Sequence, residues 1–304
     1  MRNAFIRGLT KLAESNKRIV FLTGDLGYKL FDDFATRYPG RFLNAGVAEQ
    51  NMVGVAAGLA SEGFRPFVYS IATFATLRCL EQIRDDVCYN ELPVTIVGVG
   101  GGFSYGANGP THHATEDLAI MRALPNMTVI APGDPVETEQ SIAAIATIDG
   151  PVYLRLGRTD DVIVHRTQPE FQIGRAITVQ EGKDCTLIAT GGMLPTAVRT
   201  AELLTTRNIA ARVVSMHTIK PLDKCVLKES CNTKLTVTLE EHSCIGGLGS
   251  AVSEWMTTEH IEQQLLIIAA EDRFTSKTGS QRSICKENGI DPEAVAHRVL
   301  EKLQ

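Results

Sequence analysis

The sequence lacks several features that would define other classes of protein. It has no Cys-x-x-Cys pair, and its seven cysteines match neither a common zinc spacing nor a small disulfide scaffold. No apolar run approaches the roughly 20 residues of a membrane span, and the N-terminus has no signal-peptide core. Thirty basic against 35 acidic residues give a net charge of −5, so nothing favours nucleic acid or an anionic membrane as partner. We expect a soluble, cytoplasmic protein with reduced thiols.

The usual nucleotide-binding fingerprints are also missing. The glycine-rich stretch 98–103 is not G-x-G-x-x-G, and no G-x-x-x-x-G-K-[ST] occurs. Residues 102–106 do spell G-x-S-x-G, the sequence of a hydrolase nucleophile elbow around Ser104. An elbow continues into a helix, whereas Ala107-Asn108-Gly109-Pro110 predicts a turn. A serine hydrolase that uses Ser104 is kept as a minor alternative.

Short apolar strands alternate with amphipathic helices, which predicts two α/β domains built on parallel sheets. Polar residues at 157–182 interrupt this pattern, and we place a first domain at 1–165, a linker at 166–182 and a smaller second domain at 183–304. Strands are expected at 19–22, 67–71, 93–97, 127–131, 151–156, 185–190, 210–216, 234–239 and 265–270. Helices are expected at 3–14, 48–62, 75–89, 115–123 (capped by Thr115), 135–147, 195–207, 222–229, 248–257, 280–287 and 292–303.

Two segments of the first domain carry candidate chemistry. The helix that includes 48–62 is small or apolar nearly all round, so we expect it to be buried, yet Glu49 lies in its first turn. This residue is either a helix-dipole acid at a solvated end or a carboxylic acid that donates to a ligand nitrogen. His112 and His113 are adjacent on an extended segment, so they point in opposite directions. They follow a strand, at the edge where α/β sheets bind ligands.

Three sequence blocks together resemble the thiamine-diphosphate enzymes of the transketolase family. These blocks are Thr23-Gly24-Asp25-Leu26, Gly46-Val47-Ala48-Glu49-Gln50-Asn51-Met52, and Gly109-Pro110-Thr111-His112 with residues 116–122 behind it. In the second domain, residues 238–242 followed by 246–252 are similar to the family's C-terminal domain. The resemblance spans essentially the whole chain, which would then consist of a pyrimidine-binding domain and a transketolase C-terminal domain.

The resemblance implies specific roles around the cofactor. Glu49 would hydrogen-bond the pyrimidine nitrogen of thiamine diphosphate and favour the imino tautomer that removes the thiazolium proton. Asp25 would lie near the cofactor's amino group, and Phe74 would pack on the pyrimidine ring. Where the family often repeats aromatic residues after this phenylalanine, the chain has Leu77 and Leu80, so fewer rings are available for stacking.

The resemblance also implies residues for the substrate. His112 would contact it, and Arg2 and Arg158 would bind a sugar phosphate through their bidentate guanidinium groups. Asn108 occupies the position where many transketolases have an aspartate that contacts a sugar hydroxyl. Gly100 occupies the position where they have a histidine near the substrate. We therefore expect an unusual sugar that still has an anionic end.

The chain has no Gly-Asp-Gly motif, with which family members hold the diphosphate through Mg²⁺. The resemblance therefore implies one subunit of a split transketolase, without a metal site of its own. An N-terminal subunit would supply the diphosphate-binding domain and Mg²⁺, and together they would form a heterotetramer that transfers a two-carbon ketol unit from a ketose to an aldose. Alternatives are a 1-deoxyxylulose-5-phosphate synthase-like fragment, the beta chain of a 2-oxo-acid dehydrogenase, and a non-catalytic paralogue.

Overall fold

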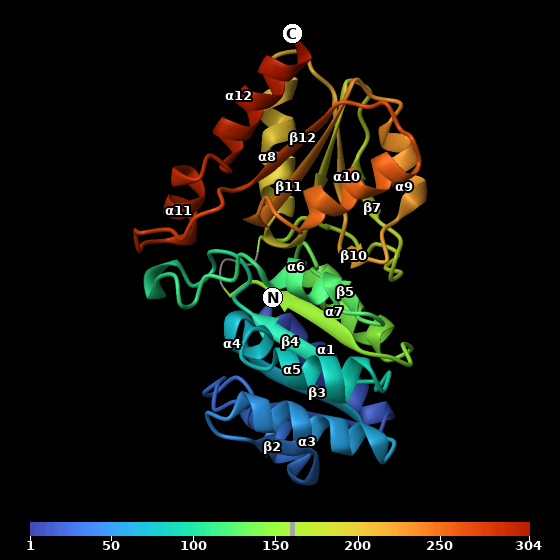
Figure 1. The fold of residues 1–304 in the computed structure, drawn as a ribbon, viewed down its shortest axis with the longest axis vertical. Coiled ribbons are helices and arrows are strands. Elements are labelled where there is room, and N and C mark those ends of the chain that lie inside the picture. The colour runs from blue at the N-terminus through green and yellow to red at the C-terminus, as the bar shows by residue number, and fades with distance from the viewer. Residues whose placement is uncertain (159–161) are drawn as a thin grey trace.

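Two β-sheets stacked along the long axis organise the chain, as Figure 1 shows. The computed structural model describes residues 1–158 and 162–304; Thr159, Asp160 and Asp161 of the expected polar stretch lie outside the described residues. Both sheets are mostly parallel and covered by helices, so the predicted α/β class with two domains is confirmed. Within the described part of the chain, no helix combines the length and apolar character needed to cross a membrane.

The first sheet has seven strands, and six of them run parallel. The strands in sheet order are β10 (Thr218–Lys220), β5 (Thr128–Ile130), β6 (Val152–Leu156), β4 (Thr95–Val99), β3 (Arg65–Ile71), β1 (Ile19–Thr23) and β2 (Phe42–Asn44). The edge strand β10 is antiparallel to β5 and comes from the second half of the sequence. The first sheet is therefore completed by residues outside the expected first domain.

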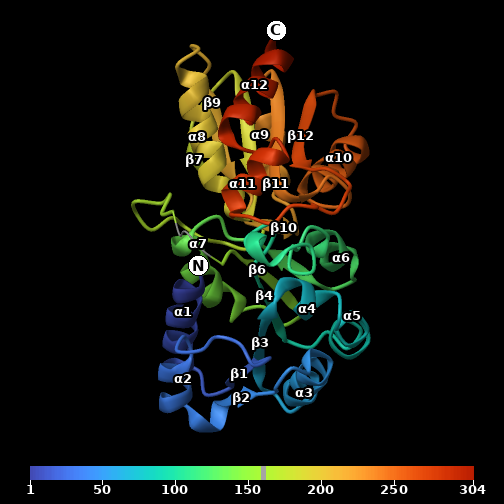
Figure 2. The same ribbon diagram turned by 90° about the vertical axis from the view of Figure 1, so that its left-hand side faces the viewer.

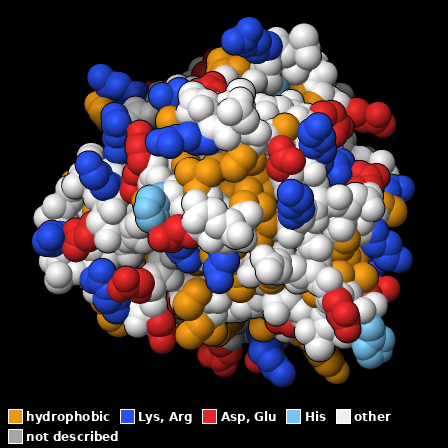
Figure 3. All heavy atoms as spheres, turned by 90° about the horizontal axis from the view of Figure 1, so that it is seen from above, with side chains coloured by type: hydrophobic (Ala, Val, Ile, Leu, Met, Phe, Trp, Pro, Cys, Tyr) orange, Lys and Arg blue, Asp and Glu red, His pale blue; other side chains and the backbone are white. Residues whose placement is uncertain are grey.

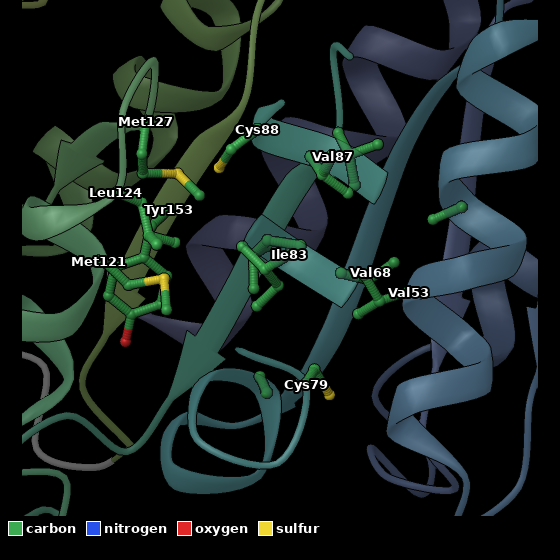
Figure 4. Close-up of a cluster of buried hydrophobic side chains, with 14 of the residues drawn as sticks. Val53, Val68, Cys79, Ile83, Val87, Cys88, Met121, Leu124, Met127 and Tyr153 are labelled. Atoms are coloured by element: carbon green, nitrogen blue, oxygen red, sulfur yellow. The ribbon is translucent and has the colours of Figure 1, made fainter. Parts of the chain in front are cut away.

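Helices cover both faces of the first sheet (Figure 2). They are α1 (Arg2–Ser15), α2 (Asp32–Arg37), η1 (Pro39–Arg41), α3 (Glu49–Ser61), α4 (Ala72–Thr76), α5 (Leu80–Gln82), η2 (Ile83–Cys88), η3 (Gly106–Asn108), α6 (Asp117–Ala123) and α7 (Pro135–Ile145). Successive side chains of β1 point to opposite faces of the sheet and so belong to two separate hydrophobic clusters. Phe21 packs with the cluster under α1 and α7, whereas Val20 packs with the cluster under α3. Figure 4 shows the second cluster, in which Val53 and Val68 lie on the far side of Ile83 from Tyr153.

The second sheet has five strands in the order β12 (Leu265–Ala270), β11 (Leu235–Ser243), β8 (Cys185–Ala189), β9 (Ala211–Ser215) and β7 (Ile177–Gln180). Its helices are η4 (Gly191–Met193), α8 (Leu194–Thr205), α9 (Lys224–Ser230), α10 (Leu248–Thr258), α11 (Gln281–Glu287) and α12 (Pro292–Leu303). On β8, Leu187 faces α8 and α12, and Ile188 faces α9 and α10. The end of the molecule formed by this domain carries an apolar area near its centre, surrounded by basic and acidic side chains (Figure 3).

Several local predictions were wrong. The expected helix at 75–89 is broken into α4, α5 and the π-helical η2, with residues 77–79 in the turn between α4 and α5. Thr115 does not cap α6: Glu116 is the N-cap residue, and the Thr115 hydroxyl donates to the Glu116 carboxylate. Residues 177–180 of the expected linker form β7, which pairs antiparallel with β9. Such tertiary pairing is not visible in local polarity.

Helix α3 is not buried all round, although its composition predicted that it would be. Met52, Val53 and Ala56 face the core, but Asn51 and Val55 are exposed on the opposite side. Open space also surrounds the positions that side chains would take at Gly54 and Gly58 on this helix. The chain by itself therefore exposes one side of α3, which includes Gly54 and Gly58 and follows the first turn that carries Glu49.

A buried ionic network joins the two domains. Arg155 on β6 donates to both carboxylate oxygens of Asp117 on α6, at 2.8 and 3.1 Å, and the Tyr153 hydroxyl donates to the same carboxylate. The Arg155 guanidinium also donates to the carbonyl of Glu241 on β11, across the domain boundary. In return, the Glu241 carboxylate accepts from the backbone N–H of Phe103 at 2.9 Å. These bonds fix the glycine-rich loop 100–115 against the second domain.

Candidate active site

The candidate residues gather at one edge of the first sheet. Because the strands from β2 to β6 in the sheet are parallel, their carboxyl ends meet at this edge. The segments that follow β1, β2, β3, β4 and β6 carry, respectively, Asp25, Glu49, Phe74, His112 and Arg158. The sequence predicted each of these residues, and the fold brings them to a common edge.

Glu49 occupies the first turn of α3 and is only 2% exposed. Its Oε1 accepts from the Ser70 hydroxyl at 3.3 Å, and its Oε2 accepts from Nη1 of Arg78 at 2.7 Å. The backbone N–H groups of this first turn add favourable dipoles for a negative charge. The carboxylate is therefore buried but satisfied, held between a strand hydroxyl and one cation.

Arg78 connects Glu49 with Phe74. It lies in the turn between α4 and α5, and its guanidinium carbon is 4.5 Å from the centroid of the Phe74 ring. This distance is typical of a cation–π contact. The edge of the ring also meets His112, with 5.2 Å between ring centroids. Phe74 thus lies between a cation and an imidazole ring.

Asp25 is held in an unusual backbone conformation in the loop after β1. Its φ is +57°, in the left-handed region that L-residues rarely adopt. The side chain of Asn44, at the end of β2, fixes it: Asn44 Nδ2 donates to Asp25 Oδ1, and Asn44 Oδ1 accepts from the Asp25 N–H. The preceding Gly24 lies close to Glu49, since a Cβ there would be 3.4 Å from the Glu49 Cγ. Strain of this kind is concentrated at functional sites.

The histidine pair is arranged as predicted, with the two rings pointing apart. His112 faces Phe74 and Tyr105, whereas the buried His113 packs edge-on against Phe103 at 5.4 Å. Partial burial and the positive charge of Arg158 lower the pKa of His112, which favours the neutral form of this imidazole. A neutral ring offers one N–H donor and one acceptor nitrogen to a ligand.

Tyr105 brings the two predicted arginines into one region. The Arg158 guanidinium carbon is 4.5 Å from the centroid of the Tyr105 ring. Burial raises the pKa of the Tyr105 hydroxyl, and the charges of Arg158 and Arg2 oppose this rise. Both cations therefore act on the same phenol, beside His112. They form the positive side of the site and suit an anionic group on a ligand.

Two other predicted residues lie on the loop after β4. Asn108 is exposed at the end of η3, three residues beyond Tyr105. Ser104 is buried, and its hydroxyl donates to the carbonyl of Gly101 at 2.8 Å. The chain continues from Ser104 into the single turn of η3 rather than into a long helix, so the segment lacks the shape of a nucleophile elbow.

A cavity of about 840 Å³ lies next to this cluster, between the two domains. Its lining includes Ser104 and Arg158 from the first domain, and Gly192, Arg199 and Glu241 from the second. Within residues 1–158 and 162–304, no group of three or more histidine, cysteine, aspartate or glutamate side chains is placed to hold a metal ion.

The sequence analysis missed three residues that position the site. These residues are Arg78, Asn44 and Tyr105, and nothing in the sequence alone assigned any of them a role at the site. Each acts through a contact between separate segments: with Glu49, with Asp25 and with Arg158. The only local signal was that each lies at most seven residues after the end of a strand at the same sheet edge, or on that end itself.

Known sequence families match nearly the whole chain. The family described as "Transketolase, pyrimidine binding domain" matches residues 1–160, and "Transketolase, C-terminal domain" matches residues 174–295. Among individual proteins, the chain is 42% identical to a putative transketolase C-terminal section of Methanocaldococcus jannaschii, over 100% of this chain and 96% of that protein. It is 36% identical to a subunit of the apulose-4-phosphate transketolase of Phocaeicola vulgatus, over 99% of this chain and 96% of that protein.

A solved structure has the same fold over nearly its full length. It is described as a split gene transketolase, inactive beta4 tetramer, and it matches with a TM-score of 0.92 and 40% identity, covering 99% of this chain and 97% of that chain. Both domains and their order agree with these relatives. This chain therefore belongs to the transketolase family and carries its pyrimidine-binding domain followed by its C-terminal domain.

Proposed function

We propose that this chain is the pyrimidine-binding subunit of a split transketolase, which transfers a two-carbon ketol unit from a ketose to an aldose with thiamine diphosphate. The observation that carries the proposal is the buried carboxylate of Glu49, 2% exposed, which Arg78 connects to the half-buried ring of Phe74 at a sheet edge. The family implies thiamine diphosphate, and this donor set suits its pyrimidine ring. A flat heterocycle with polar edges needs both a carboxylate and a ring to pack against.

Two residues of this chain would hold the pyrimidine, and a third would lie beside it. Glu49 would bind the ring nitrogen and keep a proton shared there, Phe74 would pack on the ring, and Asp25 would lie near the amino group. When bound, thiamine diphosphate supplies a nucleophilic carbon and accepts the electrons released when the ketose bond breaks. The strained Asp25 backbone, fixed by Asn44, supports a role in binding rather than in folding.

The substrate would lie on the positive side of the site. Burial and the charge of Arg158 lower the pKa of His112 and so favour the neutral ring, which can hydrogen-bond a sugar hydroxyl or move a proton. Arg2 and Arg158 would bind the anionic end of the sugar, and Asn108 would contact a hydroxyl on the way to it. The adjoining cavity leaves room for a sugar phosphate.

We further propose that activity requires a partner chain that provides the diphosphate-binding domain and Mg²⁺, in a heterotetramer. The exposed side of α3, with Asn51 and Val55, supports an assembly contact at this helix. Val47 and Tyr28, at 76% and 90% exposed, are large apolar side chains close to Asp25 and Glu49 in the sequence. Apolar side chains left in solvent beside a site favour closure by a second chain.

A reconstitution experiment tests the proposal. This chain would be purified alone and together with a co-expressed chain that carries Gly-Asp-Gly and a downstream asparagine. Transfer from xylulose 5-phosphate to ribose 5-phosphate is expected only with both chains, thiamine diphosphate and Mg²⁺. Robust turnover by this chain alone would contradict the need for a partner. Consumption of pyruvate but of no ketose would instead favour the 2-oxo-acid dehydrogenase alternative.

The choice of sugar needs a separate assay. The reconstituted enzyme would be given matched phosphorylated and neutral ketoses, and kcat/KM would be compared. With two arginines near the site, we expect a preference of at least tenfold for the anionic ketose, about 1.4 kcal/mol of differential binding. Arg158→Gln should remove most of this preference. A preference for the neutral sugar would overturn the assignment of both arginines.

A further inference from the structure

Arg78 contacts the two groups that the pyrimidine ring would use. Its Nη1 is 2.7 Å from Oε2 of Glu49, and its guanidinium carbon lies 4.5 Å from the centroid of Phe74. Building on the proposed function, we infer that Arg78 is an internal stand-in for the pyrimidine ring. While the chain is without cofactor, Arg78 pairs with the Glu49 carboxylate and packs on the Phe74 ring. It must move away from both when the pyrimidine ring binds.

The chemistry of the two groups is alike. A guanidinium is flat, carries N–H donors in its plane and stacks on aromatic faces. An aminopyrimidine that is protonated on its ring nitrogen has the same three properties. One carboxylate and one ring face therefore recognise either group, but they cannot bind both through the same oxygen and the same face.

The two partners of the ion pair differ in their freedom to move. The side chain of Glu49 is 2% exposed, whereas that of Arg78 is 44% exposed and comes from the turn between α4 and α5. Breaking a pair by removing one partner leaves an uncompensated buried charge, which is strongly unfavourable. Arg78 avoids this state by staying on Glu49 until another donor replaces it, and it can then extend into solvent without burying its charge.

Competition of this kind lowers the apparent affinity for the ring. In the chain without cofactor, most molecules hold Glu49 in the ion pair with Arg78, and only the fraction with a free carboxylate binds the ligand directly. Removing the competing cation should therefore strengthen binding. The gain in affinity should appear only in variants that keep the Glu49 carboxylate, since Arg78 competes with the ligand for this group.

Calorimetric titration of the full chain with 4-amino-5-hydroxymethyl-2-methylpyrimidine, which takes up one proton from water on its ring nitrogen when it binds the Glu49 carboxylate, tests this inference without a partner chain. We expect R78M to bind the probe about tenfold more tightly than the wild type, about 1.4 kcal/mol. R84M is the matched control, because Arg84 is an exposed arginine nearby that pairs with Asp85; its affinity should not change. Thermal unfolding would verify that each variant is folded.

A second pair of variants shows whether the effect passes through Glu49. In an E49Q background, R78M should give no gain, and the difference between the two gains is the coupling between these residues. Equal affinity of the wild type and R78M would overturn the inference and leave the proposed function standing. Weaker binding by R78M would also overturn it, because Arg78 would then help to hold the ring. Absence of binding by every variant, R78M included, would contradict both the inference and the proposed pyrimidine site.

Discussion

Removal of Asp117 should strongly destabilise the first domain. This carboxylate is almost fully buried on α6 and accepts from the Arg155 guanidinium and from the Tyr153 hydroxyl. The Arg155 side chain is only 4% exposed, and Asp117→Ala would remove its countercharge. The same substitution would leave the Tyr153 hydroxyl without its acceptor. The carbonyls of Ala114 and Glu241 would still accept from Arg155, but they carry no full charge.

The expected loss follows from the burial of this pair. Breaking a buried ion pair by removing one partner costs about 3–5 kcal/mol. For a domain of this size, each kcal/mol lowers the midpoint of thermal unfolding by about 2–4 °C, so we expect a decrease of about 6–20 °C. The loop that carries His112 should also loosen, because Arg155 holds the carbonyl of Ala114 two residues away.

Urea and thermal unfolding followed by circular dichroism would measure this loss. An exposed pair provides the control: Glu202→Gln breaks the contact with Arg199, and its effect should stay below about 0.5 kcal/mol. The double variant with Asp117→Leu and Arg155→Met should be less destabilised than Asp117→Ala, because neither member of this ion pair is left as an unpaired buried charge. A loss below about 1 kcal/mol for Asp117→Ala would refute the reasoning.

Three further predictions concern the site, the segment after β6 and the second domain. In the reconstituted enzyme, Glu49→Gln should lower kcat by several orders of magnitude with an unchanged unfolding curve, and near-full activity would contradict the proposed role. Burial acts to lower the pKa of His165, but its hydrogen bond to Glu137 and the charge of that carboxylate outweigh burial and raise it. The stability difference between wild type and His165→Gln should therefore be full below about pH 6.5 and decline as the pH rises through the raised pKa; a difference that grows with pH would contradict this sign. Gly247→Ala would place a Cβ 1.9 Å from Oε2 of Glu240, which accepts from the first N–H groups of α10; we expect a loss of about 1–3 kcal/mol in urea unfolding, and an unchanged midpoint would show that the carboxylate can move freely.

Much of the fold was predictable from local pattern. The apolar runs at 19–22, 185–190 and 265–270 became β1, β8 and β12 within one residue at each end. The last predicted helix, 292–303, coincides with α12; in the structure Asp291 caps this helix and proline occupies its first position. These elements are governed by burial and capping within the segment itself, so sequence periodicity was sufficient to find them.

The prediction failed where a distant segment decides the outcome. The strand β10 completes the first sheet from residues 218–220, and β7 lies in the expected linker, because each pairs with a strand far along the chain. The expected helix at 75–89 is interrupted near Arg78, where the turn lets this side chain reach Glu49. Hydrogen bonds and charges from other segments outweighed local propensity in each case.

The sequence by itself determined the family, the two α/β domains and the presence of Glu49, Phe74 and His112 on segments that follow strands of the first sheet. Residue type and spacing are sufficient for this, because parallel strands bring their carboxyl ends to one edge. Only the tertiary structure decided what each side chain touches. It paired Glu49 with Arg78 and left one side of α3 exposed. The physical reason is that burial and pairing are properties of neighbours in space, which a linear pattern does not contain.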